Sequence, residues 1–272
     1  MNFHTVSIHG VPRSGTSWLG QIFDSHPDAA YRHQPLFAYR FKDRLNLEST
    51  PEDVSRFLHE LYHVPNDEFI LDIMRRESAP EFWRRAVKAN RPRYLVMKMV
   101  RYHHLLRLFL EKIEDVRIIG IVRNPCAVIN SWLQAPKEFR AAWKAHEEWR
   151  YAAKKNAGRA EEFNGFEKWK EVALMFLRLE QEYPNSFCIT QYEHLVSAPV
   201  TEVARLFSFV GLDVQQQTLD FIHLSHSKHD PDPYSVIKDP TSYRRWETEL
   251  DPSIATEIVA EIRGTELEGF LV

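Results

Sequence analysis

The segment G-V-P-R-S-G-T-S combines glycines, one arginine and hydroxyl side chains at a spacing that suits an anion. Gly10 and Gly15 are separated by four residues, which is the glycine frame of a phosphate-binding loop. A loop for nucleoside triphosphates continues Gly-Lys-Ser/Thr, whereas Thr16 stands at that lysine position here and Ser17 follows. Arg13 is therefore the only cation in the loop. The frame predicts an anion site, and the missing lysine argues against a nucleoside triphosphate.

The residues on either side of this loop predict the elements that position it. Val6 and Ile8 belong to a short uncharged strand before the loop. From Thr16 onward apolar side chains recur at helical spacing, at Trp18, Leu19, Ile22 and Phe23. A strand, a glycine-bearing loop and a helix N-terminus direct backbone amides and the positive end of the helix dipole at one point.

Two further cations follow predicted strands. Lys98 comes after the apolar run Tyr94–Met97, and Arg123 comes after Val116–Val122, the clearest buried strand of the chain. The carboxyl ends of parallel strands meet at one edge of a sheet, so we expect Arg13, Lys98 and Arg123 to converge. A site for a nucleoside triphosphate places a Mg²⁺-binding aspartate near that edge. The three cations instead predict an anionic ligand that needs no metal.

Four blocks of the sequence, in order, resemble the sulfotransferases that use 3′-phosphoadenosine 5′-phosphosulfate (PAPS). G-V-P-R-S-G-T-S-W, residues 10–18, resembles their 5′-phosphosulfate loop, and I-V-R-N-P-C-A-V-I-N-S-W, residues 121–132, resembles their 3′-phosphate motif. Q-Y-E-H-L-V-S-A-P, residues 191–199, and R-L-F-S-F-V-G-L, residues 205–212, resemble the segments that follow. The chain is most similar to the carbohydrate-sulfotransferase branch, in a soluble form that lacks the N-terminal anchor of Golgi members.

The resemblance implies roles for particular residues. It assigns the 5′-phosphosulfate to the loop residues Arg13, Ser14, Gly15, Thr16, Ser17 and Trp18. It assigns the 3′-phosphate to Arg123 and Ser131, and the neighbourhood of the adenine to Tyr192. Arg244 or Arg245 would close over the cofactor, as a basic C-terminal segment does in cytosolic members. PAPS would be the donor and PAP the product.

The resemblance does not identify the general base. The carbohydrate branch usually has Glu-Pro where this chain has Gln34-Pro35, and a glutamine cannot take a proton. His33, His103 and His104 are the nearby candidates, because an imidazole titrates near neutral pH. We favour His33, which adjoins the family's catalytic position. Loop amides, Arg13 and Lys98 would stabilise the charge that develops on the leaving phosphate.

Two other functions remain open from the sequence. A Mg·ATP-dependent P-loop kinase would share the loop frame, but the absent lysine and Arg123 count against it. A non-catalytic module that binds PAP or PAPS without turnover would explain Gln34. The acceptor of a sulfotransferase would be a sugar or another small molecule, and its identity cannot be read from the sequence.

Composition and the alternation of elements predict the architecture. The 272 residues are 44% hydrophobic and carry a net charge of −3, which argues against general nucleic-acid binding. Two cysteines and no long apolar run predict a cytoplasmic protein without disulfides, a signal peptide or a membrane span. Strands alternating with helices predict one α/β domain over residues 1–272, a P-loop NTPase-like parallel sheet with helices on both faces.

Other patterns give narrower expectations. Amphipathic helices are expected at residues 52–62, 80–89, 105–113, 166–182 and 201–210, and one long polar helix at residues 138–156. The histidines at 223, 226 and 229 lack a common helical face and an accompanying cysteine, so no metal site is predicted there. The oligomeric state is not predicted.

Overall fold

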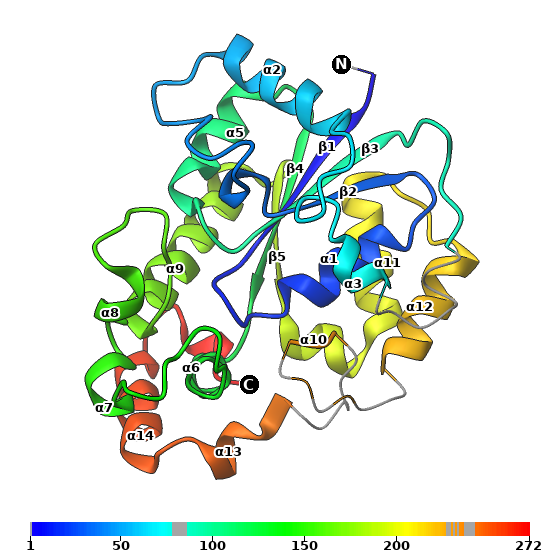
Figure 1. The fold of residues 1–272 in the computed structure, drawn as a ribbon. Helices are drawn as coiled ribbons and strands as arrows, with labels where there is room; N and C mark the ends of the chain where they lie inside the picture. Colours follow the sequence, from blue (N-terminus) through cyan, green and yellow to red (C-terminus); the bar gives the residue numbers. More distant parts are fainter. Residues whose placement is uncertain (1, 78–85, 227–229, 231, 233, 237–242) are drawn as a thin grey trace.

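A five-stranded parallel sheet organises the computed structural model (Figure 1), which describes residues 2–77, 86–226, 230, 232, 234–236 and 243–272. Its strand order is β2-β3-β1-β4-β5, and each neighbouring pair runs parallel. The strands are β1 (His4–His9), β2 (Ala29–His33), β3 (Tyr94–Met99), β4 (Val116–Val122) and β5 (Phe187–Gln191). The predicted fold class, a P-loop-like parallel sheet between helices, is confirmed.

Alternating side chains of the strands supply two separate apolar layers. Along β3, Leu95 and Met97 enter one hydrophobic cluster, whereas Tyr94 and Val96 enter the other. The first layer packs against α2 (Pro51–Tyr62), α5 (Leu106–Lys112), α6 (Pro125–Leu133), α9 (Phe166–Glu182) and α14 (Pro252–Ile262). The second packs against α1 (Thr16–Asp24), α10 (Tyr192–Ser197), α11 (Pro199–Val210) and α12 (Gln216–His226).

Short helices complete the chain around the carboxyl edge of the sheet and its flanks. They are α3 (Ile73–Glu77), α7 (Ala145–Glu148), α8 (Ala153–Asn156), α13 (Trp246–Glu249) and the 3₁₀ turns Pro35–Phe37, His103–Leu105 and Glu268–Phe270. Local sequence explains several boundaries: Thr50 and Asp53 form a capping box ahead of α2, and Gly211 ends α11 in the left-handed conformation.

Two sequence-based expectations differ from the structure. The long helix expected over residues 138–156 is wrong, because this segment contains only the short helices α7 and α8 within turns. Ala152 and Ala157 adopt positive φ values of 46° and 49°, which no continuous helix allows. The helix expected over residues 80–89 falls largely outside the described residues, and residues 86–89 are not helical. The patterns also did not predict α12.

None of the helices in the described segments combines the length and the apolar character needed to cross a bilayer.

Candidate active site

A cavity of about 530 Å³ opens beyond the carboxyl ends of β1, β3 and β4. Its walls come from the loop before α1, the end of β3, α6, the start of α10, residues 234–236 and α13. This is the edge at which ligands bind in open α/β sheets.

The glycines of the loop are required by close approaches of other elements. Gly15, with φ 91°, caps the N-terminus of α1, and a Cβ added there would lie 2.3 Å from Cδ2 of Tyr192. A Cβ on Gly10 would lie 2.6 Å from the carbonyl oxygen of Ile121. The loop therefore packs directly against β4 and α10, which brings the amides of the α1 N-terminus to the cavity.

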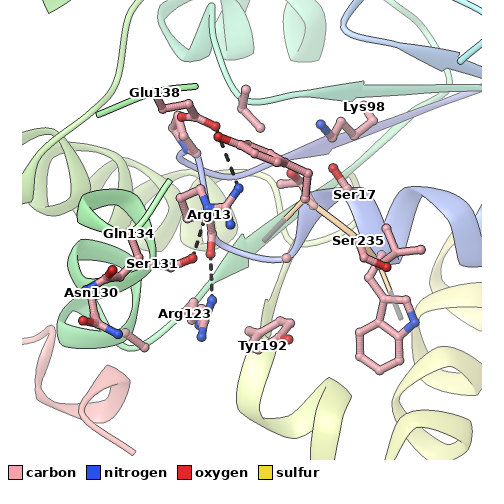
Figure 2. Close-up of a pocket in the computed structure, with 18 of the residues that line it drawn as sticks. Arg13, Ser17, Lys98, Arg123, Asn130, Ser131, Gln134, Glu138, Tyr192 and Ser235 are labelled. Atoms are coloured by element: carbon pink, nitrogen blue, oxygen red, sulfur yellow. Dashed lines mark hydrogen bonds and ion pairs between the residues drawn. The ribbon is translucent and has the colours of Figure 1, made fainter. Parts of the chain in front are cut away.

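The side chain of Arg13 joins the loop to α6 and the turn after it (Figure 2). Its Nε donates to Ser131 Oγ at 3.0 Å, and its Nη1 lies 3.8 Å from Oε1 of Glu138. The ring of Tyr234 faces the guanidinium at 5.3 Å. Burial lowers the pKa of Arg13, and the Glu138 charge opposes that shift.

Arg123 binds the same loop from the end of β4. Its Nη1 donates to the carbonyl oxygen of Arg13 at 3.1 Å, and its guanidinium lies 4.6 Å from the ring centroid of Tyr192. Its Nε is buried and has no hydrogen-bond partner among the described residues. A buried donor without an acceptor is costly, so an anionic oxygen in the cavity would satisfy it. The residues present fit a phosphorylated ligand.

Lys98 and His33 lie side by side, because they are register partners of β3 and β2. Both line the cavity and are buried. Burial, reinforced by Arg75, lowers the pKa of Lys98 to about 7. Burial and the charge of Lys98 hold the pKa of His33 well below its usual value. Among the described residues, no hydrogen bond or ion pair involves the Lys98 ammonium.

Both ring nitrogens of His33 face neighbouring side chains. Arg101 donates to Oε1 of Gln34 at 3.0 Å, which turns the Gln34 amide nitrogen toward His33 Nε2 at 3.2 Å. On the other side, Nδ1 lies 3.4 Å from the hydroxyl of Tyr31 and 3.8 Å from Asp72 Oδ2. This geometry counts against His33 as a ready proton acceptor.

The structure does not bring His103 and His104 to the cavity. His103 is fully buried in the core, where its Nδ1 lies 3.1 Å from Nδ1 of His9 and its ring packs on Phe163. His104 is half-buried beside Tyr102 and is not a lining residue. Neither ring therefore reaches the cavity at the carboxyl edge of the sheet.

The other residues implied by the resemblance fall into two groups. Most of them line the cavity, namely Gly15, Thr16, Ser17, Trp18, Ser131, Tyr192 and Arg245. Arg245 is held there by Glu249 at 2.6 Å. Ser14 is buried beneath the loop, and Arg244 is exposed, paired with Glu247 and not a lining residue.

A family model described as "Sulfotransferase family" matches residues 6–216. The chain belongs to the sulfotransferase family.

Relatives of this sulfotransferase are distant in sequence. It is 22% identical over 217 residues to a Caenorhabditis briggsae protein named "Putative protein-tyrosine sulfotransferase", covering 79% of this chain and 68% of that protein. Its fold is similar to mouse SULT7A1 solved with PAP, at 17% identity and TM-score 0.54, covering 98% of this chain and 87% of the other. It is also similar to the sulfotransferase domain of the Synechococcus olefin synthase, at 20% identity and TM-score 0.52, over 92% and 90%. Membership of the carbohydrate branch stays a prediction.

Several lining residues of this sulfotransferase were not predicted from its sequence. They are Asn130, Gln134, Glu138, Tyr234 and Glu249. Asn130 adjoins Ser131 in the 3′-phosphate block, so position alone could have indicated it. Glu138, Tyr234 and Glu249 come from turns and a short helix whose packing has no sequence signature.

No group of three or more His, Cys, Asp or Glu side chains in the described part of the chain could hold a metal ion. The side chain of His226 and the whole of His229 lie outside that part, so the His223–His229 pattern is not tested.

Proposed function

We propose that this cavity binds PAPS and that the protein transfers its sulfuryl group to a hydroxyl of an acceptor. The convergence of Arg13, Arg123 and Ser131 at the loop carries the proposal. Arg13 comes from a different block of the chain than Arg123 and Ser131, yet it contacts both of them. Arg123 also has an unpartnered buried donor there.

Different residues of the cavity would bind different parts of PAPS. The amides before α1, with Arg13, Thr16 and Ser17, would hold the 5′-phosphosulfate. Arg123 and Ser131 would hold the 3′-phosphate. Tyr192 and Trp18, whose ring centroids are 6.3 Å apart, would form the wall beside the adenine. The mouse structure is similar in fold, at low sequence identity, and it was solved with PAP. A ligand of this class is therefore compatible with the fold.

Sulfuryl transfer leaves charge on the departing phosphate oxygen as its bond to sulfur breaks. Positive groups fixed in a cavity stabilise such charge better than water does, because they need no reorientation during the reaction. Arg13, in the loop, and the ammonium form of Lys98, at the end of β3, both line the cavity (Figure 2). We assign them this role.

The acceptor is proposed only as a hydroxyl-bearing molecule. A sugar or small-molecule hydroxyl follows from the sequence resemblance, and a tyrosine hydroxyl is suggested by the name of the Caenorhabditis briggsae relative. A retinol dehydratase of similar fold, at TM-score 0.55, was solved with androsterone and PAP. All of these acceptors have in common an oxygen that must lose a proton.

Binding of PAP without metal tests the proposal against its alternatives. Calorimetry should detect binding of PAP in the absence of divalent cations and little binding of Mg·ATP. A preference for Mg·ATP would favour the kinase, and PAP binding without turnover of PAPS across acceptors would favour the binding module.

The variant Arg123→Ala should weaken PAP binding about 10- to 100-fold, since charge-assisted hydrogen bonds contribute about 1.5–3 kcal/mol. Arg107→Ala is the matched control, because Arg107 is an exposed residue paired with Glu182 away from the cavity. Equal PAP affinity in both variants would refute the 3′-phosphate assignment.

A further inference from the structure

Two carboxylates line the cavity in the described part of the chain, Glu138 and Glu249. Glu249 is already bound: it accepts from Asn130 Nδ2 at 2.8 Å and pairs with Arg245 at 2.6 Å. In contrast, no hydrogen bond from the described residues reaches the Glu138 carboxylate. Its lone pairs are therefore available to a ligand.

The turn after α6 points Glu138 into the cavity. The amides of Glu138 and Phe139 both donate to the carbonyl oxygen of Ala135 at 2.8 Å. Phe139 packs edge-on against Trp132 of α6 at 5.2 Å, and the amide of Lys137 donates to the hydroxyl of Tyr234 at 2.7 Å. The backbone on both sides of Glu138 is thus fixed, and it presents Glu138 to the cavity.

Glu138 also lies where the reacting group would be held. Its Oε1 is 3.8 Å from Nη1 of Arg13, the loop cation, and its charge acts on Lys98, whose pKa it raises. Figure 2 shows these three side chains around one space. About 24% of the Glu138 side chain is exposed, which leaves it accessible to an acceptor.

The neighbouring candidate is less suited to accept a proton. Nε2 of His33 faces the Gln34 amide nitrogen, whose orientation Arg101 fixes, and Nδ1 faces Tyr31 and Asp72. A proton on Nε2 would meet an amide that itself donates. His33 would have to break this arrangement before acting as a base.

We propose that Glu138 is the general base that accepts the proton of the acceptor hydroxyl. This inference rests on the proposed sulfuryl transfer. As the acceptor oxygen bonds to sulfur, the bond from sulfur to the phosphate oxygen breaks, and the hydroxyl proton passes to the Glu138 carboxylate. The products are the sulfate ester and PAP, and Glu138 then releases the proton to solvent.

The location of Glu138 gives the proposal a second consequence. A carboxylate beside an anion site repels the anion, so Glu138 should oppose binding of PAP even as it promotes turnover. A residue with a merely structural role would instead support both PAP binding and turnover. The Glu138→Gln variant separates these effects, because it keeps the shape of the side chain and removes the charge.

The test compares Glu138→Gln with wild type, with Glu147→Gln as an exposed control in α7 and His33→Gln as the rival base. PAP affinity is measured by calorimetry, and turnover of PAPS is measured with 4-ethylphenol and 4-nitrophenol. We expect Glu138→Gln to bind PAP as tightly as wild type or more tightly. Its kcat with 4-ethylphenol should fall about 100- to 10,000-fold. The loss with 4-nitrophenol, which is largely ionised at pH 8, should be much smaller, and the acidic limb of the pH–rate profile should disappear.

The outcomes distinguish this inference from the proposed function. Failure of the wild-type protein to bind PAP would refute PAPS chemistry and the base with it. Unchanged kcat and pH profile in Glu138→Gln, or loss of the acidic limb in His33→Gln alone, would refute Glu138 but leave sulfuryl transfer standing. If neither phenol reacts, release of PAP from PAPS by water replaces them; equal rates in Glu138→Gln and wild type would then refute the proposal.

Discussion

Lys98 carries a buried amino group in the cavity that we propose binds PAPS. Burial lowers its pKa to about 7, and Arg75 and Arg101 act in the same direction. Asp72 and Glu138 oppose them. Near neutral pH a large fraction of the protein therefore holds Lys98 as a neutral amine. An anion arriving in the cavity would favour the charged form, so we expect donor binding to take up a proton.

This coupling predicts that PAP binds less tightly as pH rises from 7 to 9. Below the free pKa of about 7 Lys98 is already charged, whereas above it each pH unit weakens binding by up to about tenfold. Phosphate monoesters have a second pKa of about 6, so the phosphates of PAP are mostly dianionic at pH 7, and their remaining ionisation would strengthen binding as pH rises, opposite to the trend. Calorimetry in buffers of different ionisation enthalpy measures the proton directly. Lys98→Arg, which stays charged, should bind PAP with little pH dependence. The same decline of PAP affinity in that variant would mean that another group causes the pH dependence.

The positions of residues that follow strands could be predicted from the sequence. Arg13 and Arg123 follow β1 and β4 closely, and the edge of a parallel sheet brings them together. The histidines could not be separated in this way. His33 lies at the end of β2, whereas His103 turns into the core, and only three-dimensional packing distinguishes them.

The loop between β1 and α1 depends on glycine because another element occupies the space of a side chain. Gly15→Ala would combine a left-handed backbone at φ 91° with a Cβ 2.3 Å from the Tyr192 ring. We expect it to lower the free energy of unfolding by roughly 2–5 kcal/mol and to weaken PAP binding. Denaturant unfolding and calorimetry measure the two effects.

Gly158→Ala is the matched control for that variant. Gly158 has a similar φ of 70°, but no atom lies within 4 Å of an added Cβ. The free energy of unfolding of Gly158→Ala should fall by only about 1–2 kcal/mol, the cost of a left-handed backbone at alanine, and its PAP affinity should not change. If the free energy of unfolding fell equally in the two variants, the close approach of Tyr192 would contribute nothing to the requirement for glycine at position 15.

The segment 138–156 explains why some elements escape prediction. Its polar residues with spaced tryptophans resemble an amphipathic helix. In the fold, the Asn156 side chain bonds to the backbone of Tyr151 and Asn164, and Trp149 is buried. On either side of α8, Ala152 and Ala157 adopt left-handed conformations. Contacts beyond a single helical turn here override the local pattern, and Glu138 lies in a separate turn at the start of the segment.

Across the molecule, burial disfavours the protonated form of several histidines. His9, at the end of β1, shares hydrogen bonds with Ser7 and His103. Its Nε2 lies 2.8 Å from Ser7 Oγ, its Nδ1 lies 3.1 Å from His103 Nδ1, and all three residues are fully buried. Burial lowers the pKa of His9 to about 3 and holds those of His103 and His33 well below normal. The rings of His9 and His103 join the first strand of the sheet to the segment after β3, so their protonation would affect the fold as a whole.

We therefore predict that the protein loses stability as pH falls from 7.5 to 5.5. The unfolded chain binds protons on these histidines below its pKa of about 6.5, whereas the folded protein does not until pH is far lower. Stability is thus full above that value and declines below it, by up to roughly 1.4 kcal/mol per pH unit for each ring. Urea unfolding at several pH values gives the number of protons linked to unfolding. His9→Gln should lower that number by about one at pH 5.5. Stability that stays constant over this range would show that the core admits protonated histidines.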